Sequence, residues 1–207
     1  MTNREASRAG GEEWVMPFSR FPIPNLEDLD VDVREQIIAA RERLGFIPNV
    51  HLALAHRPDE YRAFFTYRNA VMDREGGLSG VEREMIVVAT SATVNCTYCV
   101  VSHGAMLRMR SGDPVLADKI AIDYRHAPLS PRQRAMLDYA VKLSIRPQEI
   151  TEADRGALVA VGFDSDDIWD ISSVVAFFAL SNRMVHALDL APNDEFFSLG
   201  RAAPEGS

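Results

Sequence analysis

The sequence holds two cysteines, and both lie in one short stretch that also contains a histidine. Cys96 and Cys99 are spaced as C-x-x-C, and His103 follows Cys99 by four residues. Residues three or four apart share one face of a helix, so the three side chains are neighbours if this stretch is helical. The thiolate is the form of cysteine that attacks peroxides and disulfides. The pattern therefore predicts thiolate chemistry.

Two features of this stretch would lower the pKa of a cysteine. If a helix begins near Asn95 or Thr97, its free N–H groups and its dipole favour an anion in the first turn, which favours Cys96. His103, one turn further along, would act as a base or a cationic partner for Cys99. The two features favour different sulfurs, so the sequence leaves open which cysteine is the nucleophile.

Glu84 is the next candidate, although it precedes Cys96 by twelve residues. On one straight helix it would lie roughly 18 Å from Cys96. If the chain instead turns around residues 94–96, Glu84 lies about 15 Å before the turn and His103 about 12 Å after it, so the two meet on antiparallel helices. Glu84 would then orient and polarise His103. The predicted order of the site is Glu84, His103, Cys99, Cys96.

The pattern Glu84-x11-Cys96-x2-Cys99-x3-His103 resembles the signature of the alkyl hydroperoxidase D (AhpD-like) family, within the carboxymuconolactone decarboxylase superfamily. The resemblance covers most of residues 30–190 and is greatest to the uncharacterised peroxidase-related branch. It implies an all-α, homo-oligomeric helical bundle and a thiol-dependent peroxidase that reduces hydrogen peroxide or organic hydroperoxides. It also implies that Cys99 becomes a sulfenic acid, that Cys96 resolves it into a disulfide, and that Glu84 and His103 relay protons. No cofactor is implied beyond an external dithiol or protein reductant.

One position departs from the family pattern. The best-studied members carry a histidine immediately before the second cysteine, where this chain has Tyr98. A tyrosine donates a hydrogen bond but is a poor base near pH 7. The difference bears on the rate and on the choice of reductant, and it leaves the nucleophile in place.

Other interpretations of the cysteines stay open. The same C-x-x-C would serve a thiol–disulfide oxidoreductase or a redox sensor without peroxidase activity. A non-enzymatic oligomeric or zinc-binding module is a further alternative, because zinc accepts cysteine, histidine and carboxylate ligands; no second C-x-x-C is present to complete a structural zinc site. Two buried inert cysteines are also an option, whereas a structural disulfide within one helical turn would constrain little. The spacing favours redox chemistry, and no metal site is predicted.

Composition limits the class of protein. The chain has 207 residues, enough for one domain with a full hydrophobic core, and 47% hydrophobic with 25% charged residues is ordinary for a soluble globular protein. The net charge of −8, with no basic cluster, argues against nucleic acid as a partner. No apolar run approaches twenty residues and no signal pattern begins the chain, which predicts no membrane association. Two close cysteines without a disulfide framework favour the cytoplasm.

Hydrophobic periodicity predicts an all-α protein, because no strand-like alternation appears. Ser79 with Glu82 is a predicted capping box at the start of the helix that carries Glu84. The final helix is apolar on nearly every face, so we expect it inside the subunit or at a subunit contact. The helices are expected over residues 30–44, 48–55, 58–72, 79 to the turn at 94–96, 97–109, 115–124, 130–145, 151–161 and 166–188.

The rest of the chain is divided as follows. Residues 1–29 are expected to form an N-terminal extension, with 1–13 mobile, residues 30–190 the helical domain, and residues 191–207 a C-terminal tail. Proline and phenylalanine are frequent over residues 14–25, which suggests an extended arm lying on its own chain or on a neighbouring subunit.

A few polar residues remain as weaker candidates. Ser91 lies near the face of Glu84 by spacing and is a candidate for a hydrogen bond within the site. Asn182 and Arg183 interrupt the apolar final helix, so they are candidates for a polar contact near the site or at an interface. The histidines outside the motif are expected to be ordinary surface or hydrogen-bonded residues. They are His51, His56, His126 and His186.

Overall fold

The computed structural model describes residues 18–201, and within that range every regular element is helical, as predicted. The mobility expected for residues 1–13 and the first part of the arm lie outside the described residues. Three short 3-10 turns join the helices, at Leu26–Asp28, Tyr124–His126 and Pro147–Glu149. The helices are α1 (Val31–Leu44), α2 (Asn49–Leu54), α3 (Pro58–Met72), α4 (Gly80–Thr93), α5 (Thr97–Ser111), α6 (Leu116–Asp123), α7 (Pro131–Ile145), α8 (Glu152–Ala160), α9 (Ser165–Leu188) and α10 (Glu195–Ser198).

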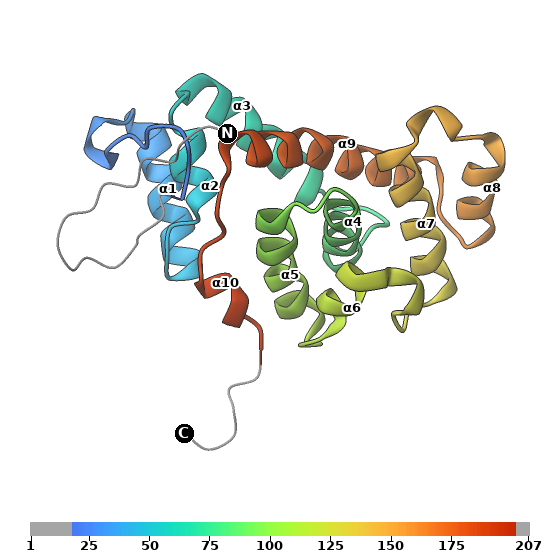
Figure 1. The fold of residues 1–207 in the computed structure, drawn as a ribbon. Coiled ribbons are helices and arrows are strands. Elements are labelled where there is room, and N and C mark those ends of the chain that lie inside the picture. The colour runs from blue at the N-terminus through green and yellow to red at the C-terminus, as the bar shows by residue number, and fades with distance from the viewer. Residues whose placement is uncertain (1–17, 202–207) are drawn as a thin grey trace, which may run out of the picture.

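Helix α4 lies at the centre of the fold and packs against α5, α6, α7 and α9. Figure 1 shows α9 running along one side of this group, while α1, α2 and α3 form a separate group at one end. Every residue of α4 from Glu82 to Ser91 is buried, which requires an element enclosed on all sides. The helix starts at the predicted capping box, in which Glu82 N–H donates to Ser79 Oγ at 3.2 Å and Ser79 N–H donates to Glu82 Oε2 at 2.9 Å. The helix that carries Glu84 is therefore enclosed on all sides and capped at its start.

A buried ion pair fixes α4 to α9. Arg83 Nη2 lies 2.7 Å from Asp170 Oδ2, and their side chains are 1% and 6% exposed. Arg83 also donates to the carbonyl oxygens of Val71 and Arg74 near the end of α3, at 2.9 and 3.2 Å. One guanidinium thus joins three segments, and its contacts with Val71 and Asp170 are buried.

Replacing Arg83 with methionine is expected to lower the free energy of unfolding by about 3 kcal/mol, because the buried Asp170 carboxylate then keeps only the half-exposed Arg74, 3.3 Å from its other oxygen, as a partner. Urea titrations followed by circular dichroism measure the change. Arg155→Met is the matched control, since Arg155 pairs with Glu152 in water, at 46% and 89% side-chain exposure, and is expected to cost under about 1 kcal/mol. Equal losses in the two variants would contradict this account.

The described part of the N-terminal arm packs on its own chain. Arg20 N–H donates to the carbonyl oxygen of Leu188 at 2.9 Å, and Ala191 N–H donates to that of Phe18 at 2.9 Å. Phe18 and Ile23 pack against the same apolar cluster that contains Cys96. The contacts tie residues 18–23 to the end of α9, beside the cysteines.

The described part of the C-terminal segment, up to residue 201, also packs on the helices. Phe196 in α10 is buried, and Arg108 of α5 donates to the carbonyl oxygens of Phe196 and Leu199 at 2.7 and 3.0 Å. Phe196 also contacts the ring of Tyr98, with centroids 6.4 Å apart. This segment therefore covers one side of α5.

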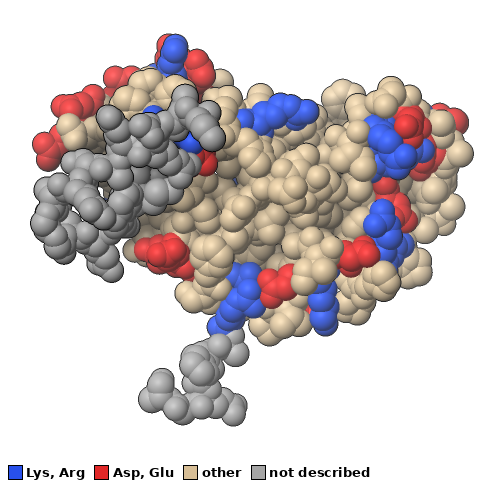
Figure 2. Space-filling view, in the orientation of Figure 1, with Lys and Arg blue, Asp and Glu red and all other residues tan. Residues whose placement is uncertain are grey.

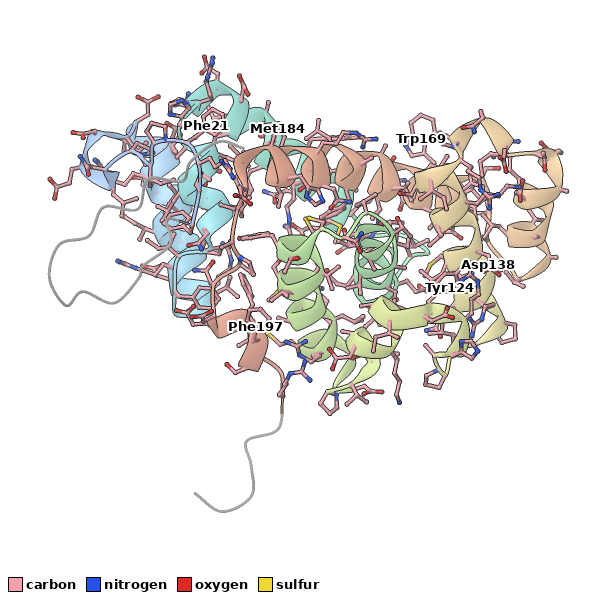
Figure 3. All side chains as sticks on the ribbon, viewed as in Figure 1. Phe21, Tyr124, Asp138, Trp169, Met184 and Phe197 are labelled. Atoms are coloured by element: carbon pink, nitrogen blue, oxygen red, sulfur yellow. The ribbon has the colours of Figure 1, made fainter. Side chains whose placement is uncertain are left out.

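Helix α9 is long and apolar enough, by length and composition, to cross a membrane, which the sequence reading did not identify. Its mean hydropathy is 1.3 over the most apolar window, and half of that window is buried inside the protein against α3, α4 and α7. Core helices of globular proteins share this composition. On its outer face Trp169 is 70% exposed and points away from the bundle (Figure 3), and charged side chains gather mostly around the edge of the face in Figure 2. The homo-oligomer stays a prediction.

Candidate active site

The turn between α4 and α5 brings the predicted residues together. Ser91 accepts a hydrogen bond at its carbonyl oxygen from Cys96 N–H at 3.0 Å, which closes the turn. Asn95 adopts a left-handed conformation with φ of 54°, and asparagine tolerates that region better than most residues. The chain reverses over residues 94–96, where the sequence predicted a turn, and α5 runs back alongside α4.

Glu84 and His103 meet across the two helices. Glu84 Oε2 lies 2.7 Å from His103 Nδ1, and the Glu84 side chain is 1% exposed. Because a carboxylate accepts hydrogen bonds, Nδ1–H donates to it and Nε2 is left with its lone pair. Arg110 lies 3.5 Å from the other carboxylate oxygen, and the His103 ring packs edge-on against Phe178. The carboxylate thus fixes the tautomer and the orientation of the imidazole.

The two cysteines occupy different environments. Both are free thiols, Cys96 fully buried and Cys99 2% exposed. Cys99 lines a pocket of about 620 Å³ together with Ser102 and His103, whereas Cys96 is not part of its lining. Cys96 is the residue before the first turn of α5 and packs in an apolar cluster with Val185. A molecule in the pocket would meet Cys99 first, with Cys96 behind it.

Cys96, the thiol that does not line the pocket, is the more acidic of the two. The pKa of Cys96 is lowered, chiefly because the Cys99 thiol donates a hydrogen bond to it, and the Cys99 backbone N–H acts in the same direction. The pKa of Cys99 is raised well above its usual value, first by that same hydrogen bond and then by burial, while the hydroxyls of Ser181 and Ser91 oppose the rise. In the reduced pair the negative charge is favoured on Cys96, although the pocket reaches Cys99.

Ser91 and Asn182, both weak candidates from the sequence, belong to this cluster. Ser91 Oγ donates to Asn182 Oδ1 at 3.0 Å, and the residues are 0% and 4% exposed. They connect α4 to α9 directly behind Cys99. Arg183, the third candidate, is exposed and donates to a carbonyl oxygen of its own helix, so the structure does not bring it into the site.

Tyr98, which stands where the family pattern has histidine, lines the pocket together with Cys99, and its hydroxyl reaches α2. Its Oη accepts a hydrogen bond from Val50 N–H, in the first turn of α2, at 3.0 Å. Burial raises the pKa of Tyr98, so the phenol keeps its proton. The residue therefore joins α5 to α2.

Tyr98→Phe is expected to destabilise the fold by about 1 kcal/mol, since Val50 N–H loses its acceptor. Chemical denaturation measures the loss. Tyr67→Phe is the control, because Tyr67 is 49% exposed and its hydroxyl has no hydrogen bond within residues 18–201. A Tyr98→Phe protein as stable as wild type would show that this bond does not hold α2.

His51, expected to be ordinary, is a lining residue of the pocket. Its ring stacks on Phe65 with centroids 4.2 Å apart, and Nδ1 lies 2.7 Å from Tyr61 Oη. Burial, followed by the positive charges of Arg43 and Arg68, lowers the pKa of His51 to about 3. No sequence motif marks His51 as a pocket residue. The only sequence feature that could have indicated it is the group of aromatic residues in α3, which hold its ring.

Acid is expected to destabilise the protein through His51. In the unfolded chain a histidine binds a proton near pH 6.5, whereas the pKa of His51 in the folded chain is about 3, so acidification favours the unfolded state. The free energy of unfolding should fall by up to about 1.4 kcal/mol per pH unit between pH 6 and pH 4. Urea titrations across this range should show a shallower fall for His51→Gln than for wild type or His126→Gln. An unchanged slope in His51→Gln would contradict this assignment.

Metal ligands are not grouped in the part of the chain that the structure describes. Among residues 18–201 no cluster of three or more histidine, cysteine, aspartate or glutamate side chains is placed to hold a metal ion. Glu84 and His103, which could serve as ligands together with the cysteines, are already hydrogen-bonded to each other.

The comparisons with known proteins agree with the geometry. The profile of the carboxymuconolactone decarboxylase family matches residues 58–121, which contain all four predicted site residues. The crystal structure of an AhpD-core, uncharacterised peroxidase-related protein from Ralstonia eutropha JMP134 is 52% identical over 91% of this chain and 99% of its own, with a TM-score of 0.89. A peroxidase-related protein from Silicibacter sp. TM1040 is 39% identical over 92% of this chain and all of its own, with a TM-score of 0.86.

A curated relative gives a shorter match. The uncharacterised protein YnjA of Escherichia coli is 29% identical over 116 residues, which are 55% of this chain. The match spans 62% of the length of YnjA, so it covers only part of that protein.

Proposed function

This chain belongs to the carboxymuconolactone decarboxylase superfamily, in its AhpD-like branch, and from that premise we propose that it is a thiol-dependent peroxidase acting on hydroperoxides. The superfamily is one of enzymes. The observation that carries the proposal is that Cys99 lines the pocket beside the His103–Glu84 pair while Cys96 lies behind it. These positions support a role for Cys99 as the attacking sulfur, for His103 as the base and for Cys96 as the resolving sulfur.

The first step oxidises Cys99. Its thiol proton passes to His103 Nε2, the sulfur attacks one oxygen of the hydroperoxide, an S–O bond forms and the O–O bond breaks. His103 returns the proton to the departing oxygen, which leaves as an alcohol or as water. The Ser181 hydroxyl favours the Cys99 thiolate, and the Glu84 carboxylate stabilises the charged imidazole. The product on the protein is a sulfenic acid.

The second step forms the disulfide. Cys96, whose lowered pKa favours the thiolate, attacks the Cys99 sulfur; the S–S bond forms and hydroxide leaves, taking up a proton to become water. An external dithiol then reduces the disulfide to two thiols and is itself oxidised. The acidity of Cys96 therefore serves the resolving step, and the position of Cys99 serves the attack.

The rival function is disulfide exchange with other proteins. Exchange requires a sulfur that another protein can approach, yet Cys96 is 0% and Cys99 2% exposed. Access through the pocket suits a small molecule better than a protein disulfide. The burial of both sulfurs therefore favours a peroxidase over an oxidoreductase of the same C-x-x-C type.

The two functions separate in one assay. Reduced protein is mixed with excess dithiothreitol and either cumene hydroperoxide or insulin, and consumption of peroxide or of insulin disulfides is followed. Catalytic loss of peroxide that requires Cys99, with no gain in insulin reduction, is the expected result. Insulin reduction without peroxide consumption would overturn the proposal in favour of disulfide exchange.

A further inference from the structure

The lining of the pocket combines apolar and cationic side chains. Its volume of about 620 Å³ is within the range of small-molecule sites and is far more than hydrogen peroxide needs. Phenylalanines from α3, α9 and α10 form much of the lining, and Cys99 and His103 lie on this apolar part beside Phe178. Arg43 of α1, His51 of α2 and Arg68 of α3 also line the pocket. The site thus has room for an organic body and offers polar groups away from α5.

His51 offers an N–H to the pocket. Tyr61 is fully buried, and the only hydrogen-bond partner of its hydroxyl within residues 18–201 is His51 Nδ1, at 2.7 Å. A phenol has one hydrogen, and a buried phenol donates it, so Tyr61 O–H donates to Nδ1. The neutral ring then carries its own proton on Nε2, for which the described residues supply no acceptor. The donor is held rigidly, because the ring is stacked on Phe65 at an angle of 9°.

Positive charge gathers around this donor. Arg43, on the last turn of α1, lines the pocket and forms no ion pair with any carboxylate in the described part of the chain. Arg68 lines it too, 2.7 Å from Asp73, and both arginines lie near enough to His51 for their charges to act on it. With Arg110, the lining holds three arginines against one aspartate, in a chain whose net charge is −8. Arg110 is paired with Glu84 and Arg68 with Asp73, so Arg43 is the arginine of this lining that has no carboxylate partner within residues 18–201.

We propose that the pocket recognises an organic anion: an apolar or aromatic body that packs on the phenylalanines, with a carboxylate bound by His51 Nε2–H and Arg43. Joined to the proposed function, on which this point rests, the substrate class is a carboxylate-bearing organic hydroperoxide. The carboxylate binds to His51 and Arg43, and the hydroperoxide group lies against Cys99. Arg68, already paired with Asp73, adds long-range attraction.

Binding is tested without any redox step. Para-carboxycumyl alcohol, which has no peroxide bond, and its methyl ester are titrated into reduced wild-type protein by isothermal calorimetry or NMR. The acid is expected to bind about tenfold more tightly than the ester, because a charge-assisted hydrogen bond is lost in the ester. Arg43→Gln should reduce the ratio to below about threefold, since its charge is the unpaired one. Acid and ester of equal affinity would overturn the inference.

A matched variant controls for general electrostatics. Arg125→Gln removes one positive charge from an arginine that is 65% exposed and outside the pocket lining, and it should leave the acid-to-ester ratio at its wild-type value. An acid-to-ester ratio that falls equally in Arg125→Gln and Arg43→Gln would overturn the assignment of the anion to His51 and Arg43.

The two proposals fail separately. If the acid binds preferentially but para-carboxycumene hydroperoxide is not consumed, the peroxidase proposal fails and the organic-anion pocket stands. The opposite outcome is that cumene hydroperoxide and its para-carboxylate are reduced at equal kcat/KM, and that para-carboxycumyl alcohol and its methyl ester bind with equal affinity. In that case the proposal of an anion site fails and the peroxidase proposal stands.

Discussion

Cys99→Ser is expected to lower the rate constant for reaction with peroxide by about a thousandfold or more, since an alcohol replaces the only thiol among the described residues that line the pocket. Cys96→Ser should retain the first oxidation, because in the proposed cycle Cys96 acts only on the sulfenic acid that Cys99 forms. Stopped-flow mixing of reduced protein with excess cumene hydroperoxide, followed by the disappearance of thiol, measures both rates.

The same two variants also test how Cys96 affects the pKa of Cys99. Cys96→Ser removes the group to which the Cys99 thiol donates its hydrogen bond, and that bond is the largest cause of the raised pKa of Cys99. The pKa of Cys99 should therefore move down in Cys96→Ser, and its first oxidation should reach full rate at a lower pH than in wild type. A fast reaction in Cys99→Ser and a slow one in Cys96→Ser would instead make Cys96 the attacking sulfur.

Glu84→Gln is expected to lower kcat/KM for peroxide by about a hundredfold, although glutamine preserves the size of the side chain. The glutamine NH₂ would donate to His103 Nδ1 where the carboxylate accepts, so the imidazole proton would move to Nε2, the atom that must accept the proton of Cys99. The negative charge that stabilises the imidazolium is lost as well. Steady-state assays with dithiothreitol, run from pH 6 to pH 9, give the rate and its pH profile.

A control and a second variant separate catalysis from folding in that experiment. Glu152→Gln removes the charge of a carboxylate that is 89% exposed, and it should leave kcat/KM unchanged. His103→Gln should resemble Glu84→Gln, and the double variant should be little worse than either, because the two residues act as one unit. Fully additive losses would show that Glu84 acts on Cys99 without His103.

Much of the fold follows from local patterns in the sequence. The start of α4 is read from Ser79 and Glu82, because both partners of a capping box lie within one turn. The return of α5 along α4 is read from chain geometry, because the distances from the turn to Glu84 and to His103 are nearly equal. Local signals were sufficient wherever the contacting residues belong to one helix or to one turn.

The parts that were missed depend on contacts between distant segments. Tyr98 was weighed as a replacement for a catalytic histidine, yet its hydroxyl is held by Val50 N–H from a different helix. His51 carries no motif, and it becomes a lining residue only because the group α1–α3 packs against α5 and α9. The acidity order of Cys96 and Cys99 depends on which thiol donates to the other, which residue spacing leaves undetermined.

The most direct test of the central claim is the mass of the reduced protein after one equivalent of hydroperoxide, with peptide mapping, for wild type and Cys96→Ser. The expected products are a Cys96–Cys99 disulfide in wild type and a dimedone-trapped sulfenic acid on Cys99 in Cys96→Ser. Thiols that survive the peroxide unchanged in both proteins would contradict the peroxidase, whatever the affinity of the pocket for organic anions.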